Sequence, residues 1–454
     1  MVAPTTTFQD ALHAVVEGGP AAISRFAASL PREWIAEALA ATGTASIRRR
    51  KLPADQAVWL VLGMGLLADR SIFNVVDHLS LVIPGTESLS SGAVTQARYR
   101  LGAEPIEWLF RAVSTAWANA GGAGLFRGLS LHAIDGTCMR VQDSDENFEH
   151  FDKPGGRSGS GDSGYPQLRL ACLLNLQTRM VEDAKFGPYT TSEQVLASAL
   201  WPSIPDDSLT LVDRGFSEFL AWSGLVTRGR NRHLMARIRR DTPMRELEEL
   251  EDGTLLVEIP PSRLALAAAP DVAPIRARII AYHHPGGEPG RLLVTLLDPR
   301  THSAKELIRL YHDRWELELA FDELKTHLLE RKECLRSKLP KGVNQELWGV
   351  LLVYNLLRRE ILLAAARHEV DPNRISFVDA LFWIRTFWLA CWKDTPGRIP
   401  EHLGEFRGSL KTLVLPERRS ERRYPRHVKI KMSNYARNRG KRPTGQAEPV
   451  RTPG

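Results

Sequence analysis

The sequence predicts a mixed α/β protein, and two changes of pattern along the chain support this. Apolar residues recur at three- and four-residue spacing from about residue 26 to residue 120, which favours helices. Short strand-like runs separated by turn residues follow, and helical spacing returns from Ala304 to about Trp392. The 454 residues are enough for a few domains of roughly 100–200 residues each.

The N-terminal region, residues 1–121, is expected to form a helical domain. Its four helical segments are residues 34–43, 54–69, 71–83 and 104–121. Arg48, Arg49 and Arg50, followed by Lys51, form a basic connector after the first segment. Four consecutive positive charges suit contact with phosphates, although a solvated loop could have the same composition.

Residues 122–230 are expected to form the first part of an α/β core. The predicted strands are Leu129–Val141, Gln167–Asn175, Arg179–Phe186 and Ser208–Val212, and a helix is predicted from Ser192 to about Trp201. The Gly- and Ser-rich stretch 153–166 predicts a loop. It lacks the GxxxxGK[ST] spacing of a nucleotide-phosphate loop.

Residues 231–303 predict a β-rich insertion, with four strand-like runs between turn residues. Helices in residues 304–365 complete the core, and residues 366–454 are expected to form a helical region that ends in a basic tail. Between Arg418 and Arg442 there are eleven Lys and Arg residues and one acidic residue, so the net positive charge of this tail alone is larger than the net charge of +7 for the whole chain. Arg422, Arg423 and Arg426 lie in this tail, which suits phosphate binding without sequence preference, with a solubilising end as the alternative.

Composition argues against several classes of protein. The four cysteines lie far apart with no Cys-x-x-Cys pair, which disfavours a disulfide framework or a structural zinc site. No apolar run reaches the roughly 20 residues that span a bilayer, and the N-terminus lacks a secretory signal. We therefore expect a soluble intracellular protein without a membrane partner, and its pI near 9.3 is compatible with an anionic partner.

Two aspartates stand at the ends of apolar strand-like runs, in contexts that favour ligand binding. Asp135 comes after LSLHAI and before Gly-Thr, and Asp213 comes after SLTLV and before Arg-Gly-Phe. A single aspartate in such a place is usually a turn former. Two on neighbouring strands make a Mg²⁺ site more credible, since Mg²⁺ is commonly held by one or two carboxylates together with substrate phosphates.

A polar stripe marks the predicted helix over residues 307–329. At about 100° per residue, Tyr311, Arg314, Glu318, Asp322 and Lys325 fall within about 80° of one face, beside an apolar stripe. Geometry alone favours either Glu318 or Asp322 as a third carboxylate of the site. A solvent-facing ladder of ion pairs would show the same spacing.

The residues Tyr311, Arg314, Glu318 and Lys325 match the pattern Y-x2-R-x3-E-x6-K. Together with Asp135, Asp213 and the NRHLMARIR segment, they make roughly residues 26–359 resemble transposases of the insertion element 4 type. These are DDE-class enzymes with an RNase H-like catalytic domain, a helical N-terminal domain and a β-rich insertion before the glutamate.

The resemblance implies a cut-and-paste DNA transposase. Asp135, Asp213 and Glu318 would hold two divalent ions, Mg²⁺ or Mn²⁺ as a substitute, for nicking at the element's ends and 3′-OH strand transfer. The partners would be double-stranded DNA, as terminal inverted repeats and target, and a second copy of the chain in the synaptic complex. The protein would belong to the bacterial cytoplasm and associate with the nucleoid when bound to DNA.

The resemblance also implies roles for the rest of the stripe. Tyr311, Arg314 and Lys325 would grip phosphates near the element's end, and Trp315 would stack on a base, cap the site or simply pack. Relatives that form a DNA hairpin use an aromatic residue of the insertion, where Tyr282 is the large aromatic available, so this step stays open. Two other functions also stay open, a DNA-binding relic that does not cut and a metal-dependent nuclease without strand transfer.

Overall fold

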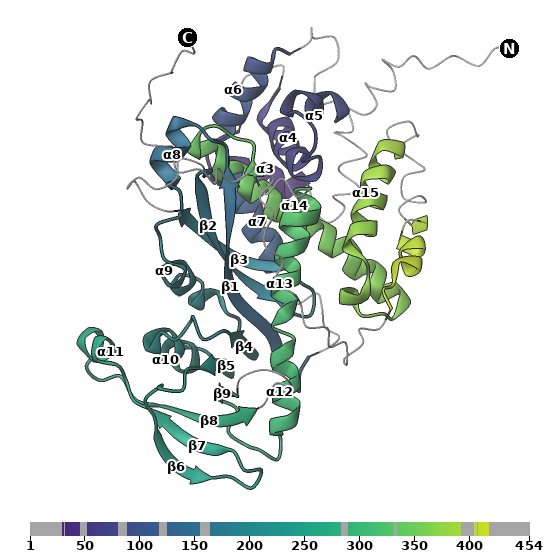
Figure 1. Ribbon diagram of the computed structural model, residues 1–454. Coiled ribbons are helices and arrows are strands. Elements are labelled where there is room, and N and C mark those ends of the chain that lie inside the picture. Colours follow the sequence, from purple (N-terminus) through teal and green to yellow (C-terminus); the bar gives the residue numbers. More distant parts are fainter. Residues whose placement is uncertain are drawn as a thin grey trace, which may run out of the picture. The chain divides into compact units, whose positions relative to one another are not determined.

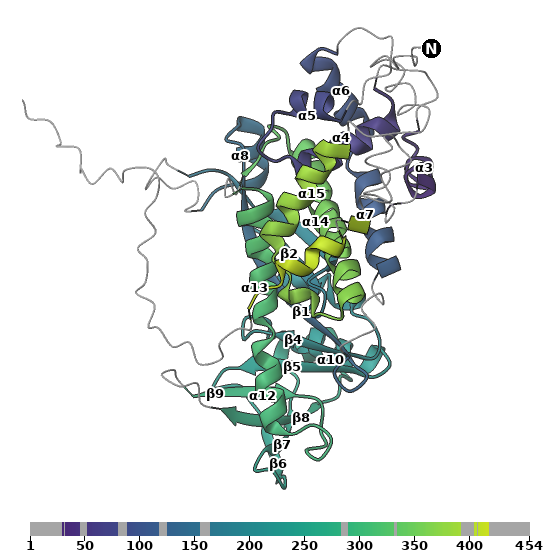
Figure 2. The same cartoon turned by 90° about the vertical axis from the view of Figure 1, so that its right-hand side faces the viewer.

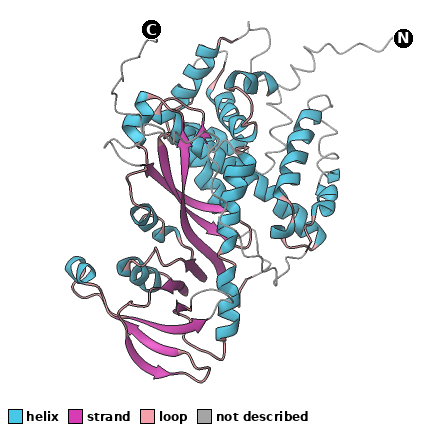
Figure 3. Ribbon diagram, in the orientation of Figure 1, coloured by secondary structure: helices cyan, strands magenta, loops and turns pink. Residues whose placement is uncertain are grey.

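The computed structural model describes residue 30 and residues 32–45, 52–79, 89–117, 125–154, 164–282, 289–330, 334–391, 404–405 and 407–416. The mixed α/β class is confirmed (Figure 3). The basic connector with Arg48, Arg49 and Arg50, the tail residues Arg422, Arg423 and Arg426, and most of the predicted loop 153–166 lie outside the described residues.

The centre of the protein is one sheet. Its strands are β1 (Ser130–Val141), β2 (Gln167–Asn175), β3 (Val181–Pro188), β4 (Ser208–Val212), β5 (Arg232–Ile238), β6 (Arg245–Glu249), β7 (Leu255–Ile259), β8 (Ile275–Tyr282), β9 (Gly290–Val294) and β10 (Cys334–Leu335). Their order is β3-β2-β1-β4-β5-β9-β8-β7-β6, with β10 paired to β1. Strands β1, β4 and β5 run parallel, and β2 and β3 are antiparallel to their neighbours, which is an RNase H-like arrangement.

The predicted insertion continues this sheet. Strand β5, expected at the start of the insertion, pairs in parallel with β4 and therefore extends the core. Strands β9, β8, β7 and β6 then add in antiparallel pairs. The outermost strand, β6, has the sequence RELEE with every residue exposed, and the apolar pattern could not predict it. Charged residues are common on edge strands because they discourage pairing with another chain.

Helices cover both faces of the sheet (Figure 1). One face carries α9 (Glu193–Ser198), α10 (Phe219–Arg228) and α11 (Arg263–Ala268), which share a core around Trp222 and Leu234. The other face carries α12 (Ala304–His312), α13 (Trp315–Asp322) and α14 (Pro340–His368). Helix α15 (Phe377–Cys391) follows α14 and contacts it.

The N-terminal helices are α3 (Arg32–Ala41), α4 (Ala54–Leu66), α5 (Ile72–His78), α6 (Ser91–Leu101) and α7 (Glu104–Trp117), and α8 (Asp145–Phe151) follows β1. Helices α6 and α8 were not predicted, because α6 is largely polar and α8 is only 7 residues long. Both begin after a serine whose hydroxyl accepts a backbone N–H, from Ala93 in α6 and from Asn147 in α8. Within the described residues, no helix combines the length and apolar character needed to cross a membrane.

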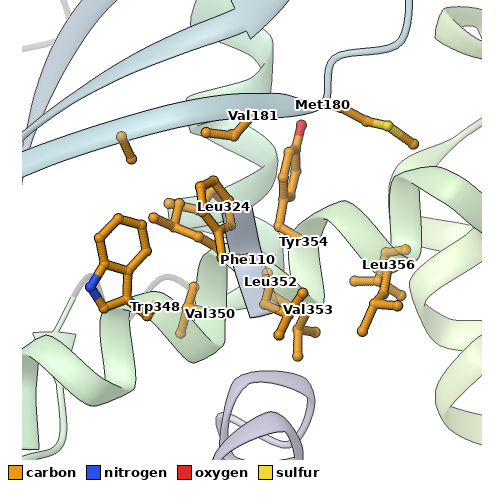
Figure 4. Packing of buried hydrophobic residues seen from close by; sticks show 14 of the residues in the cluster. Phe110, Met180, Val181, Leu324, Trp348, Val350, Leu352, Val353, Tyr354 and Leu356 are labelled. Carbon is orange, nitrogen blue, oxygen red and sulfur yellow. The ribbon is translucent and has the colours of Figure 1, made fainter. Parts of the chain in front are cut away.

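Helix α14 joins the N-terminal helices to the sheet. A Cβ on Gly349 would lie 2.6 Å from a methyl carbon of Val61, and a Cβ on Gly65 would lie 3.1 Å from a methyl carbon of Val353, so α4 and α14 pack backbone to backbone. Trp348 of α14 packs against Phe110 of α7, with ring centroids 5.1 Å apart (Figure 4), and against Phe186 of β3, with centroids 5.2 Å apart. The N-terminal helices and the sheet therefore share one hydrophobic core.

Candidate active site

Asp135 and Asp213 lie side by side where the pairing of two parallel strands ends. The last pair of β1 with β4 is Ile134 with Val212, so the two aspartates are the next residues on neighbouring strands. Their side chains alternate with buried Ile134 and Val212 and therefore point to the face that carries α13. Asp135 lies within β1, not at its end as its sequence context suggested, because β1 continues to Val141 along β2.

This part of β1 has an open edge. Strand β4 stops at Val212, and β10 pairs with β1 only at Arg140 and Val141. Between them, residues 135–139 face no strand of the described chain on that side. Residues 135–138 at this edge are half-buried, whereas Met139 is buried.

A tight turn fixes Asp213 at the end of β4. The N–H of Gly215 donates to Oδ1 of Asp213, and the N–H of Phe216 donates to the Asp213 carbonyl at 3.2 Å. The indole N–H of Trp222 donates to the Phe216 carbonyl at 2.8 Å, which ties the turn to α10. The RGF motif thus forms a turn that holds the carboxylate.

Asp135 has several partners. The N–H of Gly136 donates to Oδ1 at 2.8 Å, and the Arg314 guanidinium donates to Oδ2 at 3.2 Å. Burial raises the pKa of Asp135, the charge of Asp213 adds to this, and the Gly136 N–H and Arg314 oppose it. The site therefore resists placing two bare carboxylates together, and Arg314 compensates part of that cost.

The predicted continuous helix over residues 307–329 is wrong in detail. Helix α12 ends at His312, and Asp313, Arg314, Glu316 and Leu317 donate to carbonyls three residues back. After α13 the backbone widens into a π-helix from Glu323 to Leu328. The tighter turn before α13 rotates the chain by a larger angle per residue than an α-helix does, and the wider turn after α13 rotates it by a smaller angle. These opposite changes leave the polar stripe facing the same side.

Helices α12 and α13 lie beside the sheet (Figure 2), and three of the four signature residues contact its strands β1 and β4 or the residue after β4. The Tyr311 hydroxyl donates to the Val212 carbonyl at 3.1 Å, and burial raises the pKa of Tyr311 to about 12, so it stays a donor at neutral pH. Arg314 bridges Asp135 and Glu318, whose Oε1 accepts at 3.0 Å. Further along β1, the Lys325 ammonium donates to the Thr137 hydroxyl at 3.3 Å.

The two candidates for the third carboxylate differ in their surroundings. Glu318 shares Arg314 with Asp135, whereas the Asp322 carboxylate accepts from the Thr326 hydroxyl at 2.6 Å and its side chain is 53% exposed. The structure thus links Glu318, not Asp322, to Asp135 through Arg314. Trp315 is 49% exposed, so it does not serve as a packed core residue.

Two residues near the site were not singled out from the sequence. Glu193, the first residue of α9, lies beside Gly136, where a Cβ on the glycine would be 2.3 Å from Oε1 of Glu193. Arg237 follows Ala236, the partner of Val212, so it extends the row of Asp135 and Asp213 onto β5. Arg237 belongs to the NRHLMARIR segment, but only the strand register shows its alignment with the aspartates, and Glu193 lies in no recognisable pattern.

Glu316 and Glu323, which are not part of the polar stripe, form a buried ion network with Arg179. Arg179, in the β2–β3 turn, donates to Glu316 at 2.6 Å and to Glu323 at 2.6 Å. Glu323 also accepts from the Tyr354 hydroxyl at 2.9 Å and pairs with Arg358. This network joins the segment that carries the signature to β2, β3 and α14.

The donors at the site are chemically suited to a hard cation. Asp135, Asp213 and Glu318 offer carboxylate oxygens, which suit Mg²⁺ or Mn²⁺. No three acidic, histidine or cysteine side chains gather tightly enough to hold an ion by themselves in the described ranges. The positive charge between Asp135 and Glu318 is the guanidinium of Arg314, which pairs with both carboxylates.

Comparisons with known proteins agree on one family. The model for the insertion element 4 transposase N-terminal region matches residues 20–111, and the model for the transposase DDE domain matches residues 127–356. The transposase InsG for insertion sequence element IS4 of Escherichia coli K12 is 33% identical over 409 residues, which cover 89% of this chain and 92% of that protein.

Two further similarities are more limited. The putative transposase InsZ of the same organism is 39% identical over 221 residues, 47% of this chain and 71% of that protein. A cryo-EM structure of a piggyBac transposase synaptic complex with hairpin DNA aligns with a TM-score of 0.38 and 10% identity, over 86% of this chain and 82% of that one.

Proposed function

Because the chain belongs to the insertion element 4 family of DDE transposases, we propose that it excises its element by nicking DNA at the element's ends and inserts it elsewhere by strand transfer. One observation carries this proposal. Tyr311, Arg314, Glu318 and Lys325 line the open edge of β1 beside Asp135 and Asp213, although more than 170 residues separate Asp135 from Glu318 in sequence.

Asp135, Asp213 and Glu318 would hold the divalent ions. When bound, Mg²⁺ or Mn²⁺ would stabilise the negative charge that develops on the attacking and leaving oxygens of a phosphodiester. Arg314 neutralises Asp135 and Glu318 in the described arrangement, and we expect it to turn to a DNA phosphate when the site is loaded. A planar guanidinium binds either a carboxylate or a phosphate through paired hydrogen bonds, so the same N–H donors can be satisfied by either partner.

The reaction would run in two displacements at phosphorus. In the first, a water oxygen bonds to the phosphorus at the element's end and the 3′ oxygen leaves as a hydroxyl. In the second, that 3′-OH bonds to a phosphorus of the target strand, and a target 3′ oxygen leaves. The first step breaks one phosphodiester and leaves a phosphate end and a 3′-OH. The second step forms one phosphodiester and breaks another. Neither step needs an oxidant or a covalent protein intermediate.

The remaining polar residues would bind DNA. Lys325 and Arg237 flank the carboxylates along the sheet, where they suit the phosphates on either side of the scissile bond. The exposed indole of Trp315 suits stacking on a base. The N-terminal helical region would bind the terminal repeat, and two copies of the chain would hold the two ends of the element.

The test is metal-dependent nicking of a duplex carrying the inverted repeat that flanks the coding sequence. We expect wild type to nick it with Mg²⁺ and Asp135→Ala and Glu318→Ala to lose nicking while still binding the duplex. Asp143→Ala, an exposed carboxylate that follows the same strand, is the matched control and should cut like wild type.

The competing functions predict different outcomes. A DNA-binding relic would nick no better than Asp135→Ala. A nuclease without strand transfer would nick normally, but it would give no joined product when supplied with pre-cleaved ends and a target plasmid.

A further inference from the structure

The segment that carries Lys325 ends in an uncommon backbone conformation. Lys325 lies in the π-helix that ends at Leu328. The N–H of Leu329 donates to the Leu324 carbonyl at 3.1 Å, and Glu330 then turns the chain with φ at 54°. This left-handed region is unfavourable for residues other than glycine, so the conformation of Glu330 depends on contacts with its surroundings.

Arg385 of α15 supplies such contacts. Its guanidinium donates to Oε1 of Glu330 at 2.6 Å and to the Leu328 carbonyl at 3.3 Å. Its Nε donates to the Leu66 carbonyl, at the end of α4, at 2.8 Å. The Arg385 side chain is only 20% exposed. One guanidinium therefore joins the end of the segment with Lys325 to the end of α4.

The end of α4 needs donors from outside the helix. Leu66 is its last residue, and the last carbonyls of a helix have no partner within it. The last turn of α4 contains no basic side chain of its own. Arg385 donates to Leu66, and Arg336 donates to the carbonyls of Met64 and Leu67. Two arginines from later in the chain thus stabilise this helix end, where positive charge is also favoured by the helix dipole.

Lys325 meets β1 about one turn before these contacts. Its ammonium donates to the Thr137 hydroxyl at 3.3 Å. Because a lysine side chain is long and flexible, the place of its ammonium depends on the backbone that carries it. A shift of the π-helix end would therefore move the ammonium away from the edge of β1.

We propose that Arg385 is a positioning residue, which holds Lys325 in place for its DNA phosphate by tying the end of its helical segment to α4. This inference rests on the proposed function, since it concerns the phosphate contact of Lys325. Helix α4 belongs to the N-terminal helices, so the same guanidinium connects Lys325 to the region that the proposed function assigns to the terminal repeat.

The test is a double-variant cycle in the full-length chain, with Arg385→Gln, Lys325→Ala and both together. Fluorescence anisotropy measures binding of the inverted-repeat duplex over a series of salt concentrations without divalent ions. We expect Arg385→Gln to lower the slope of log K against log salt by about 0.9, the value for one phosphate contact, as Lys325→Ala does. The double variant should keep the slope of Lys325→Ala, because both changes remove the same contact.

Two further variants sharpen the test. Arg336→Gln is the matched control, because it removes donors from the same end of α4, and it should keep the wild-type slope. Glu330→Ala breaks the tie from the other side, so it should lower the slope even if Arg385→Gln does not fold, which circular dichroism would show.

The outcomes separate the two proposals. A lower slope in the double variant than in Lys325→Ala would mean that Arg385 contacts DNA itself, and the inference would be wrong. It would also be wrong if Arg385→Gln lowered only the urea midpoint, if Arg336→Gln lowered the slope equally, or if Lys325→Ala kept the wild-type slope. The proposed function fails separately, if wild type does not nick the duplex when Mg²⁺ is added.

Discussion

Replacing Glu323 by glutamine should destabilise the protein strongly, because this carboxylate is the shared partner of two buried guanidinium groups. Glu323 is 6% exposed, and its two oxygens face Arg179 on one side and Tyr354 and Arg358 on the other. The Arg358 side chain is fully buried, and Glu323 is the carboxylate paired with it. A neutral amide would leave that guanidinium charged and uncompensated within the core.

The size of the effect follows from this burial. Removing one partner of a buried ion pair typically costs about 3–5 kcal/mol. Glu316→Gln is the matched control, because Arg179 would keep Glu323 as a charged partner, so we expect a smaller loss, nearer the about 1.5–3 kcal/mol of a charged hydrogen bond. With a urea dependence near the upper end of the usual range, about 3 kcal/mol/M, Glu323→Gln should lower the unfolding midpoint by about 1–1.7 M.

Urea unfolding followed by tryptophan fluorescence measures this difference, and the double variant Glu323→Leu with Arg358→Met tests its cause. If the cost comes from an unpaired buried charge, two apolar side chains should recover most of the lost stability. Equal midpoints for Glu323→Gln and Glu316→Gln, or no recovery in the double variant, would refute the reasoning.

Three further predictions concern the site. Glu318→Gln should lower metal-dependent nicking by about 10³-fold or more while duplex binding stays intact, because a metal ligand contributes several kcal/mol to the transition state; Asp322→Asn should stay near wild type in the same gel assay, and the reverse ranking would place the site one turn away. Lys325→Ala should weaken DNA binding and lower the slope of log K against log salt by about 0.9, whereas the same change at Lys305 should leave the slope unaltered in a fluorescence anisotropy titration. Without divalent ions, Asp135→Asn should stabilise the chain more at pH 7 than at pH 4. Because the pKa of Asp135 is raised in the folded state, the stability that its proton contributes is present at low pH and is lost as pH rises. A difference in unfolding midpoint that does not change with pH would contradict this.

Much of the fold could be predicted from the sequence because apolar periodicity reports burial directly. The strands β1, β2 and β4 and the long helices carry such patterns and lie close to their predicted ranges. Strand β6 could not be found, since all five of its residues are exposed and only pairing with β7 makes it a strand. The interruption of the helix at Arg314 and its π-helical end also leave no trace in side-chain spacing.

The site shows the same division. Asp135, Asp213 and Glu318 stand in motifs that the sequence exposes; the structure places the two aspartates on neighbouring strands and links Glu318 to Asp135 through Arg314. Glu193 was not predicted, because its place depends on the space beside Gly136, which only tertiary structure defines. A helical wheel could place Glu323 off the polar stripe, but it could not reveal that Arg179 and Arg358 lie on that side and pair with it.

The close packing of α4 against α14 limits how the N-terminal helices of this chain can be exchanged for those of another protein. Gly65 and Gly349 let the two backbones touch, so a foreign N-terminal half with a larger residue at either contact would collide with α14. An exchange of the N-terminal helices would therefore have to include α14, although some 270 residues separate α4 from α14 in the chain. If only the N-terminal helices were replaced, the poorly fitting contact with α14 would lie inside the hydrophobic core, away from solvent.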